Sequence, residues 1–190
     1  MVLGTQKLNN SITVLHVDDN SNILNLTEDF LEREDNEFVI ETATSADNGL
    51  DRIRDSKPDC VVSDYDMPGK NGIEFLQSVR EEYPDIPFIL FTGKGSESIA
   101  SEAISAGVTD YLQKKSGAEQ YELLANRITN AVEARRTARS ATRQAELMRL
   151  TELTGNTGGW ELDLETGEFL PTSGARQFAG VSPDKAFTLE

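Results

Sequence analysis

The sequence has few of the residues that build disulfides or basic binding surfaces. Its 190 residues include one cysteine, Cys60, and 18 Lys plus Arg against 33 Asp plus Glu. A single cysteine excludes a disulfide framework within the chain, which fits a reducing compartment, so we expect a cytoplasmic location. The net charge of -15 lacks the basic footprint that a nucleic-acid surface requires, and we expect no nucleic-acid partner.

Long hydrophobic runs are also absent. No apolar stretch approaches the roughly 20 residues of a membrane-spanning helix, and residues 1–10 contain no apolar core of a signal peptide. We therefore expect no membrane partner. The acidic excess has two interpretations that stay open: a well-solvated surface, or adaptation to high salt.

Short β-branched or apolar runs alternate with stretches of helical periodicity. The runs are Ile12–Val17, Phe38–Thr42, Cys60–Ser63, Ile86–Phe91 and Val108–Leu112. This alternation predicts an α/β fold with a five-stranded, doubly wound parallel sheet and helices on both faces. Ser21, Ser45 and Ser96 are predicted helix N-caps, and Gly107 is predicted to follow the end of a helix.

Polar side chains stand where the predicted strands end. Asp18 and Asp19 follow the first run, Asp64 ends the third, Thr92 follows the fourth and Lys114 lies just past the fifth. Ligands of open parallel sheets bind at the carboxyl ends of the strands, so these groups should meet at one edge. The second run supplies no such group, as expected if it lies at the outer edge of the sheet.

Clustered carboxylates at that edge indicate a cation and phosphoryl chemistry. Two carboxylates 4 Å apart repel by about 4 kcal/mol at an effective dielectric of about 20, so a cation should offset them. Oxygen ligands suit Mg²⁺, and a carboxylate beside Mg²⁺ can attack a phosphoryl group. Lys114 and Thr92 would stabilise the charge of the transferring group.

Four motifs in order resemble the receiver domains of response regulators, over residues 11–131. The motifs are VLHVDDN, PDCVVSDYDMPGKNGIEFL, FILFTGKG and AGVTDYLQKK. The resemblance implies a flavodoxin-like fold with strand order 2-1-3-4-5. It implies that Asp64 is the phosphoacceptor of a two-component phosphorelay, and that a histidine kinase or phosphotransfer protein is the partner that donates the phosphoryl group.

The same resemblance assigns roles to the other motif residues. The Mg²⁺ ligands would be Asp18, Asp19, Asp64 and the main-chain carbonyl of Asp66, and Thr92 and Lys114 would contact the phosphoryl group. Tyr111 would be a switch residue that turns inward as Thr92 moves. The chain would be a switch and not an enzyme, beyond adding and removing its own phosphoryl group. The one histidine, His16, lies inside a predicted strand, and we interpret it as structural.

Two positions depart from the family pattern. Lys115 stands where the family has proline, commonly after a cis bond, and Gly93 stands where alanine is usual. A cis bond before a non-proline residue costs about 2.5–4 kcal/mol. Either the bond before Lys115 is trans and the loop differs, or the site stores strain.

Three other functions are possible interpretations of the same residues. Lys115 alone favours a receiver-like docking module that does not accept phosphate. Asp64-Tyr65-Asp66 resembles the Asp-x-Asp motif of haloacid-dehalogenase-type phosphatases. Those enzymes usually carry the motif on the first strand with threonine or valine two residues later, whereas here it lies on the third predicted strand and Pro68 takes that place. A flavodoxin-like flavin site is disfavoured, because no phosphate-binding loop follows the first strand.

The chain beyond the receiver-like region divides by composition into a helical linker at 132–153 and a segment at 154–190. Residues 118–150 lack Gly and Pro, which predicts a helical extension. A weak seam consists of Leu124, Ile128, Ala131, Ala138 and Ala145. Two interpretations stay open: a plain linker helix, or a coiled coil that forms a homodimer and passes the signal on.

The final segment predicts the first part of a second domain. GGWELDLETGEFLPTS should form two strands, Gly159–Leu164 and Glu168–Leu170, joined by a turn at 165–167. It is similar to the opening of a PAS domain. Because about 36 residues are too few for a stable core, we expect a truncated α+β fragment from which no cofactor can be argued.

Overall fold

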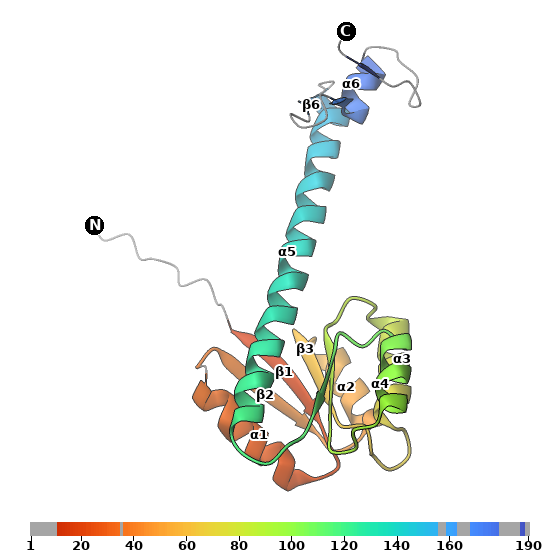
Figure 1. Cartoon of the computed structure of the whole chain (residues 1–190). Helices are drawn as coiled ribbons and strands as arrows, with labels where there is room; N and C mark the ends of the chain where they lie inside the picture. The colour runs from red at the N-terminus through yellow and green to blue at the C-terminus, as the bar shows by residue number, and fades with distance from the viewer. Residues whose placement is uncertain (1–10, 35, 156–158, 163–167, 179–186, 189–190) are drawn as a thin grey trace, which may run out of the picture. The chain divides into compact units, whose positions relative to one another are not determined.

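The computed structural model describes residues 11–34, 36–155, 159–162, 168–178 and 187–188 (Figure 1). The chain divides into two compact units, Met1–Arg135 and Arg136–Glu190. The elements that begin in the first unit are β1 (Ile12–Val17), α1 (Ser21–Glu34), β2 (Phe38–Ala43), α2 (Ala46–Ser56), β3 (Cys60–Ser63), α3 (Gly72–Glu82), β4 (Phe88–Thr92), α4 (Glu97–Ser105), β5 (Asp110–Gln113) and α5 (Glu119–Gly155).

The first unit is a five-stranded parallel sheet in the order β2-β1-β3-β4-β5, which confirms the predicted fold and strand order. Strands β3 and β4 are buried along their whole length. Helices cover both faces, so these central strands are apolar up to their last residues, Ser63 and Thr92, and do not alternate with polar residues. Strand β2 lies at the edge, as predicted from its lack of a site residue.

Two hydrophobic cores lie on opposite faces of the sheet. One includes Leu15, Phe75 and Phe88 and packs under α2, α3 and α4. The other includes Leu31 of α1 and Leu124 of α5. Figure 1 accordingly shows α1 and the start of α5 on one side of the sheet, and α2, α3 and α4 on the other. The helices thus fix the strands from both faces and leave their carboxyl ends open at one edge.

The helix ends follow local polar chemistry. Ser45 and Ser96 cap α2 and α4 as predicted. The prediction for Ser21 was wrong: Ser21 already lies in the first turn of α1, and the side chain of Asn20 accepts the N–H of Asn22 at 3.0 Å. Gly107 follows α4 with φ +84°, a left-handed conformation that glycine adopts without strain.

Two strands begin later than predicted, and each shift has a backbone cause. Strand β4 begins at Phe88 and not at Ile86, because Pro87 has no N–H to donate to the ladder. Strand β5 begins at Asp110 and not at Val108. The N–H of Val108 donates to the carbonyl of Ala103, so it belongs to the turn that ends α4.

Helix α5 runs without a break from Glu119 to Gly155. Its first turns bury Leu124, Ile128 and Val132 in the core of the first unit, so the beginning of the predicted seam faces this core. Ala138 and Ala145, further along the seam, are exposed. Within the described part of the chain, no helix combines the length and hydropathy needed to cross a bilayer.

The second unit contains a small antiparallel sheet in the order β6-β7-β8 and a short helix, α6, which comes between β7 and β8 in the chain and contacts β7. Its elements are β6 (Trp160–Leu162), β7 (Glu168–Pro171), α6 (Ser173–Phe178) and β8 (Phe187–Thr188). The two predicted strands pair with each other, with Glu161 opposite Leu170. The predicted turn at 165–167 lies outside the described residues. The similarity of this segment to a PAS domain stays a prediction.

Candidate functional site

A cleft of about 300 Å³ opens at the carboxyl edge of the parallel sheet. Its walls come from the segments that follow β1, β3, β4 and β5. The lining residues are Asp18, Asp19, Asn20, Ile23, Asp64, Asp66, Thr92, Gly93, Lys94 and Lys114. The structure therefore brings together every predicted site residue except Tyr111, which does not line this cleft.

Backbone hydrogen bonds continue beyond the strands and place the charged side chains. The N–H of Asp18 donates to Ala43 at 3.1 Å, and the N–H of Asp64 donates to Val17 at 2.8 Å. The N–H of Lys114 donates to the carbonyl of Thr92 at 2.8 Å. Each residue is thus held by the neighbouring strand at the point where the sheet ends.

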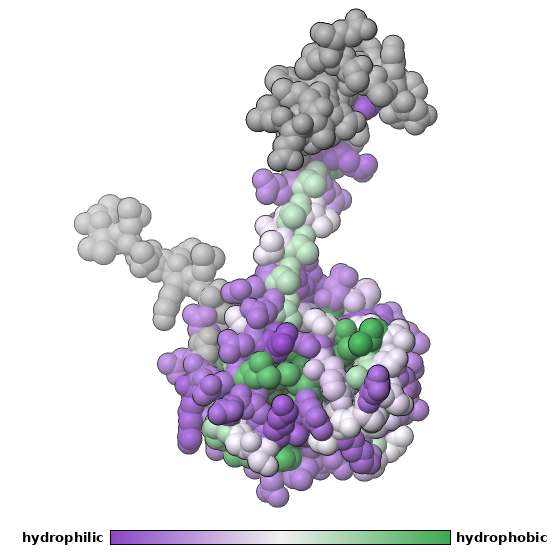
Figure 2. Space-filling model, viewed as in Figure 1, coloured by the Kyte–Doolittle hydropathy of each residue, from purple (hydrophilic) through white to green (hydrophobic). Residues whose placement is uncertain are grey.

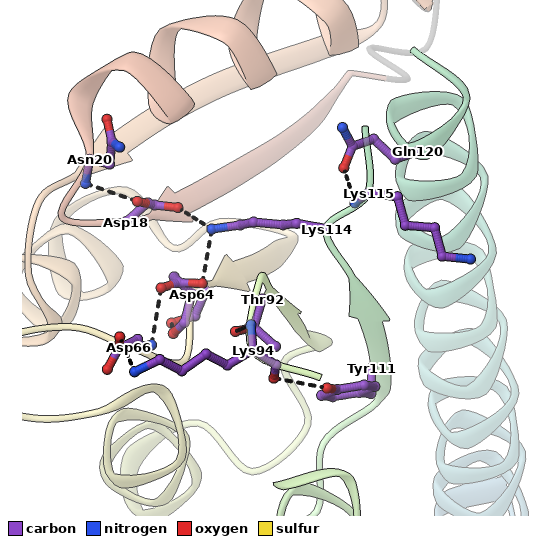
Figure 3. Close-up of polar contacts among 11 residues, drawn as sticks. Asp18, Asn20, Asp64, Asp66, Thr92, Lys94, Tyr111, Lys114, Lys115 and Gln120 are labelled. Atoms are coloured by element: carbon purple, nitrogen blue, oxygen red, sulfur yellow. Dashed lines mark hydrogen bonds and ion pairs between the residues drawn. The ribbon is translucent and has the colours of Figure 1, made fainter. Parts of the chain in front are cut away.

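The ammonium of Lys114 lies between two carboxylates (Figure 3). Its Nζ is 2.5 Å from Oδ2 of Asp18 and 2.9 Å from Oδ1 of Asp64. The Asp18 side chain is only 2% exposed and that of Asp64 10%. Burial raises the pKa of Asp18, and the contact with Lys114 opposes that rise. The positive charge of Lys114 therefore offsets part of the electrostatic cost of placing two carboxylates here.

Each oxygen of the Asp64 carboxylate has its own partner. Oδ1 contacts Lys114, and Oδ2 accepts the N–H of Asp66 at 3.0 Å. Gly72, at the start of α3, approaches the main chain here so closely that a Cβ would overlap the carbonyl oxygen of Asp64. Lys114 and the amide of Asp66 thus orient the carboxylate, and the missing side chain of Gly72 makes room for the main chain of Asp64.

Lys94 is a cleft residue that the sequence analysis missed. Its N–H donates to Oγ1 of Thr92 at 3.1 Å, and its carbonyl accepts the hydroxyl of Tyr111 at 3.3 Å. Its Nζ is 2.5 Å from Oδ2 of Asp66. Tyr111 is half-buried, and this hydrogen bond joins it to a residue that lines the cleft. A charged residue two positions past a strand end was the available signal for Lys94.

The loop at Lys115 adopts the first of the two predicted alternatives. No described peptide bond is cis, so the bond before Lys115 is trans. The N–H of Lys115, which proline would lack, donates to Oε1 of Gln120 at 2.8 Å. The amide of Gln120 in turn donates to the carbonyl of Gly117 at 3.0 Å. Lys114 contacts Asp64 with this different loop in place.

The donor atoms of the cleft have the chemistry of a magnesium site. Carboxylate oxygens of Asp18 and Asp64 and the main-chain carbonyl of Asp66 are hard ligands of the kind that Mg²⁺ prefers. Among the described residues, no group of three or more His, Cys, Asp or Glu side chains is spaced to hold a metal ion. Asp19 is exposed at the rim. The oxygen ligands fit Mg²⁺ in type, and in this structure the positive charge beside Asp18 and Asp64 comes from Lys114.

Comparisons with known proteins point to one family. The sequence matches the response regulator receiver domain over residues 14–126, which is more than half of the chain. A protein-glutamate methylesterase/protein-glutamine glutaminase of Methanosarcina mazei is 34% identical over 107 residues, covering 56% of this chain and 29% of the relative. The transcriptional regulatory protein ResD of Bacillus subtilis is 33% identical over 105 residues, covering 55% of this chain and 42% of the relative.

A solved structure gives the same result. The crystal structure of a response regulator receiver domain protein from Clostridium thermocellum matches with a TM-score of 0.60 at 28% identity, covering 67% of this chain and 98% of that one. The chain spans less than half the length of the two curated relatives. Sequence match and fold together show that this chain belongs to the response regulator receiver domain family.

Proposed function

We propose that Asp64 accepts a phosphoryl group from a phosphohistidine of a histidine kinase or phosphotransfer protein. The observation that carries the proposal is the contact of Lys114 with the Asp64 carboxylate, at 2.9 Å, inside a cleft that Thr92 also lines. A nucleophilic carboxylate, a fixed ammonium and a hydroxyl are the groups that phosphoryl transfer to an aspartate needs.

The phosphoryl group would pass directly from the donor histidine to Asp64. A carboxylate oxygen of Asp64 forms a bond to phosphorus, the bond from phosphorus to the donor nitrogen breaks, and its electron pair stays on the imidazole. Lys114 offsets charge on the phosphoryl oxygens, and the hydroxyl of Thr92 donates to one of them. When bound, Mg²⁺ supplies further charge stabilisation, and Asp18, Asp19, Asp64 and the Asp66 carbonyl would hold it.

The signal would leave through the surface of α4, β5 and α5, where Tyr111 lies. Figure 2 shows a largely hydrophilic face with separate hydrophobic patches. Exposed hydrophobic residues on these elements include Ile104 of α4, 70% exposed, and Leu123 of α5, 44% exposed. A pocket of about 390 Å³ between β5 and α5 has Tyr111 in its wall. Phosphorylation would shift the population of two states of this surface.

The output would then pass along α5 to the segment after it, which resembles a PAS domain. Leu147 and Leu150 of α5 are 56% and 48% exposed, and they offer an apolar contact to a second copy of the chain. A homodimer through this part of the helix is therefore the assembly that we propose.

Modification of Asp64 tests the proposal directly. The purified chain is incubated with Mg²⁺ and either beryllofluoride or a small acyl-phosphate donor. With the acyl-phosphate donor, intact mass should show one added phosphoryl group. With beryllofluoride, which transfers no phosphoryl group, the ¹⁹F signal of the bound mimic should appear instead, and both signals should require Mg²⁺. Asp64→Asn should abolish it, whereas Asp85→Asn, an exposed acidic residue outside the cleft, should leave it unchanged. Equal signals in wild type and Asp64→Asn, or no signal in any chain, would contradict the proposal, and the second result would favour a docking module.

A further inference from the structure

Positive charge is concentrated on the part of α5 that lies in the second unit. Residues 136–150 contain four arginines and a single acidic residue, Glu146, in a chain whose net charge is -15. Arg139 and Arg143 are exposed, and neither forms an ion pair with a residue that the structure describes. The charge of these two guanidiniums is therefore not compensated by the acidic remainder of the described chain.

Arg139 and Arg143 share one face of α5 with Leu147 and Leu150. Successive members of this set are four, four and three residues apart, which is the spacing of side chains on one side of an α-helix. The two leucines are the exposed residues through which two copies of the chain would pair in the proposed homodimer. A parallel pair of helices joined there also brings Arg139 and Arg143 of one copy against the same residues of the other.

Self-pairing of this face meets electrostatic repulsion. The pair of helices brings together four guanidiniums, and Glu146 supplies only two carboxylates, so an excess of two positive charges remains. Arginine cannot lose its proton in a protein, so a change of pH does not remove this charge. Like charges that face each other across paired helices oppose association. The leucines can therefore pack well only when another group offsets the arginines.

A multivalent oxyanion of the phosphate class has the chemistry that offsets this charge. The planar guanidinium donates two parallel N–H bonds to the oxygens of such an anion. Four residues separate Arg139 from Arg143, a rise of about 6 Å along the helix axis, so one anion can contact both side chains. Chloride carries a single charge and has no pair of oxygens to accept the two bonds.

We propose that two copies of α5 form a binding site for a multivalent oxyanion, held by Arg139 and Arg143 of each copy. The inference rests on the homodimer of the proposed function and adds a second input to it. Without the anion, repulsion between the guanidiniums weakens the pair of helices. With the anion bound, Leu147 and Leu150 of the two copies pack together. The output would then depend on a dissolved oxyanion as well as on phosphorylation of Asp64.

Sedimentation velocity of the full chain tests the site by measuring the dissociation constant of the dimer. The chain is compared in NaCl and in sodium pyrophosphate at equal ionic strength. Mg²⁺ and phosphoryl donors are left out, so modification of Asp64 plays no part. The variant that removes the site combines Arg139→Leu with Arg143→Leu. Its matched control combines Arg33→Leu with Arg52→Leu, which removes the same two charges from exposed positions on α1 and α2.

Saturating pyrophosphate should lower the dissociation constant of the wild-type dimer roughly tenfold or more, because only the dimer holds the complete site. The control variant should respond like the wild type. The variant without Arg139 and Arg143 should dimerise in NaCl and should not respond to pyrophosphate.

Three other results would contradict the inference. Equal dimerisation of the wild type in both salts, or an equal response of the variant without the two arginines, would overturn the oxyanion site and leave the homodimer in place. Cosedimentation of the wild type with phosphatidylglycerol vesicles, without a response to pyrophosphate, would assign the arginines to a lipid headgroup instead. If no chain dimerises in either salt, the proposed homodimer is wrong and the oxyanion site fails with it.

Discussion

Gly72 shows how a single missing side chain shapes the site. It begins α3, and a Cβ there would overlap the main-chain carbonyl of Asp64 and crowd a methyl group of Leu90. Gly72→Ala should destabilise the chain by about 1–3 kcal/mol, as overpacking does, although alanine favours helix. Urea denaturation measures the loss. Gly93→Ala, with open space around its Cβ, is the matched control and should change stability by less than about 0.5 kcal/mol. Equal stability of the two variants would show that the main chain at Asp64 yields easily.

His16 carries a pH dependence of folding. It is fully buried, and neither ring nitrogen has a hydrogen-bond partner among the described residues. Burial, with a smaller effect of Lys114, lowers its pKa to about 3, whereas the unfolded value is about 6.5. Between these two values the unfolded chain binds a proton that the folded chain does not, so stability falls as the pH drops.

The effect of His16 can be separated from that of the many carboxylates. From pH 7 to pH 5 this residue should account for a loss of about 2 kcal/mol in the free energy of unfolding. The His16→Leu chain has no imidazole to titrate at this position. Its free energy of unfolding, measured by urea denaturation, should therefore fall by about 2 kcal/mol less than that of the wild type between pH 7 and pH 5. If wild type and variant lose equal stability, the pH dependence arises elsewhere.

At the scale of the element, the start of α3 depends on a reciprocal cap. The side chain of Asn71 accepts the N–H of Glu74 at 3.0 Å, and the Glu74 carboxylate accepts the N–H of Asn71 at 2.9 Å. Asn71→Ala should lower the free energy of unfolding by about 1 kcal/mol. Ser78→Ala, in the exposed middle of the same helix, should stay within about 0.5 kcal/mol. Thermal or urea unfolding decides, and equal losses would mean that the cap contributes nothing specific.

The sequence predicted the elements better than their ends. The existence of the strands follows from the apolar runs, their order was implied by the resemblance to receiver domains, and both are confirmed. The starts of β4 and β5 depended on which amides enter the ladder, and that was decided by Pro87 and by the turn at Val108. Periodicity carries no information on such choices, because it reports side-chain burial and not hydrogen-bond partners.

The placement of a site residue was predictable where it depends on residue type at a strand end, as for Asp64 and Lys114. It was not predictable where a role depends on contacts between loops. Lys94 acquires its position from Asp66 and Tyr111, which lie 28 and 17 residues away in sequence. The hydrogen bond from the N–H of Lys115 to Gln120 was likewise not predictable, because it depends on the conformation of the loop after a trans peptide bond.

At the scale of the whole molecule, the charge of -15 should make folding salt-dependent. Self-repulsion destabilises the compact state, and raising NaCl from about 0.1 M to about 1 M shortens the screening length from about 10 Å to about 3 Å. Exposed ion pairs such as Arg54–Glu82 and Lys70–Asp47 weaken at the same time, but each contributes little. Repulsion should therefore dominate, and the urea midpoint should rise with salt. Equal rises in NaCl and KCl would identify screening, and a falling midpoint would mean that the ion pairs matter more.

The contact of Lys114 with both Asp18 and Asp64 makes the stability of the folded chain independent of the metal that phosphorylation requires. The lysine is covalently part of the chain, so the acidic pair is compensated at every moment of the protein's life, whatever the supply of metal around it. In the proposed function, Mg²⁺ then governs how readily Asp64 is phosphorylated and not whether the chain is folded. In a cell depleted of Mg²⁺, the protein would stay folded and would lose only its response to the phosphoryl donor.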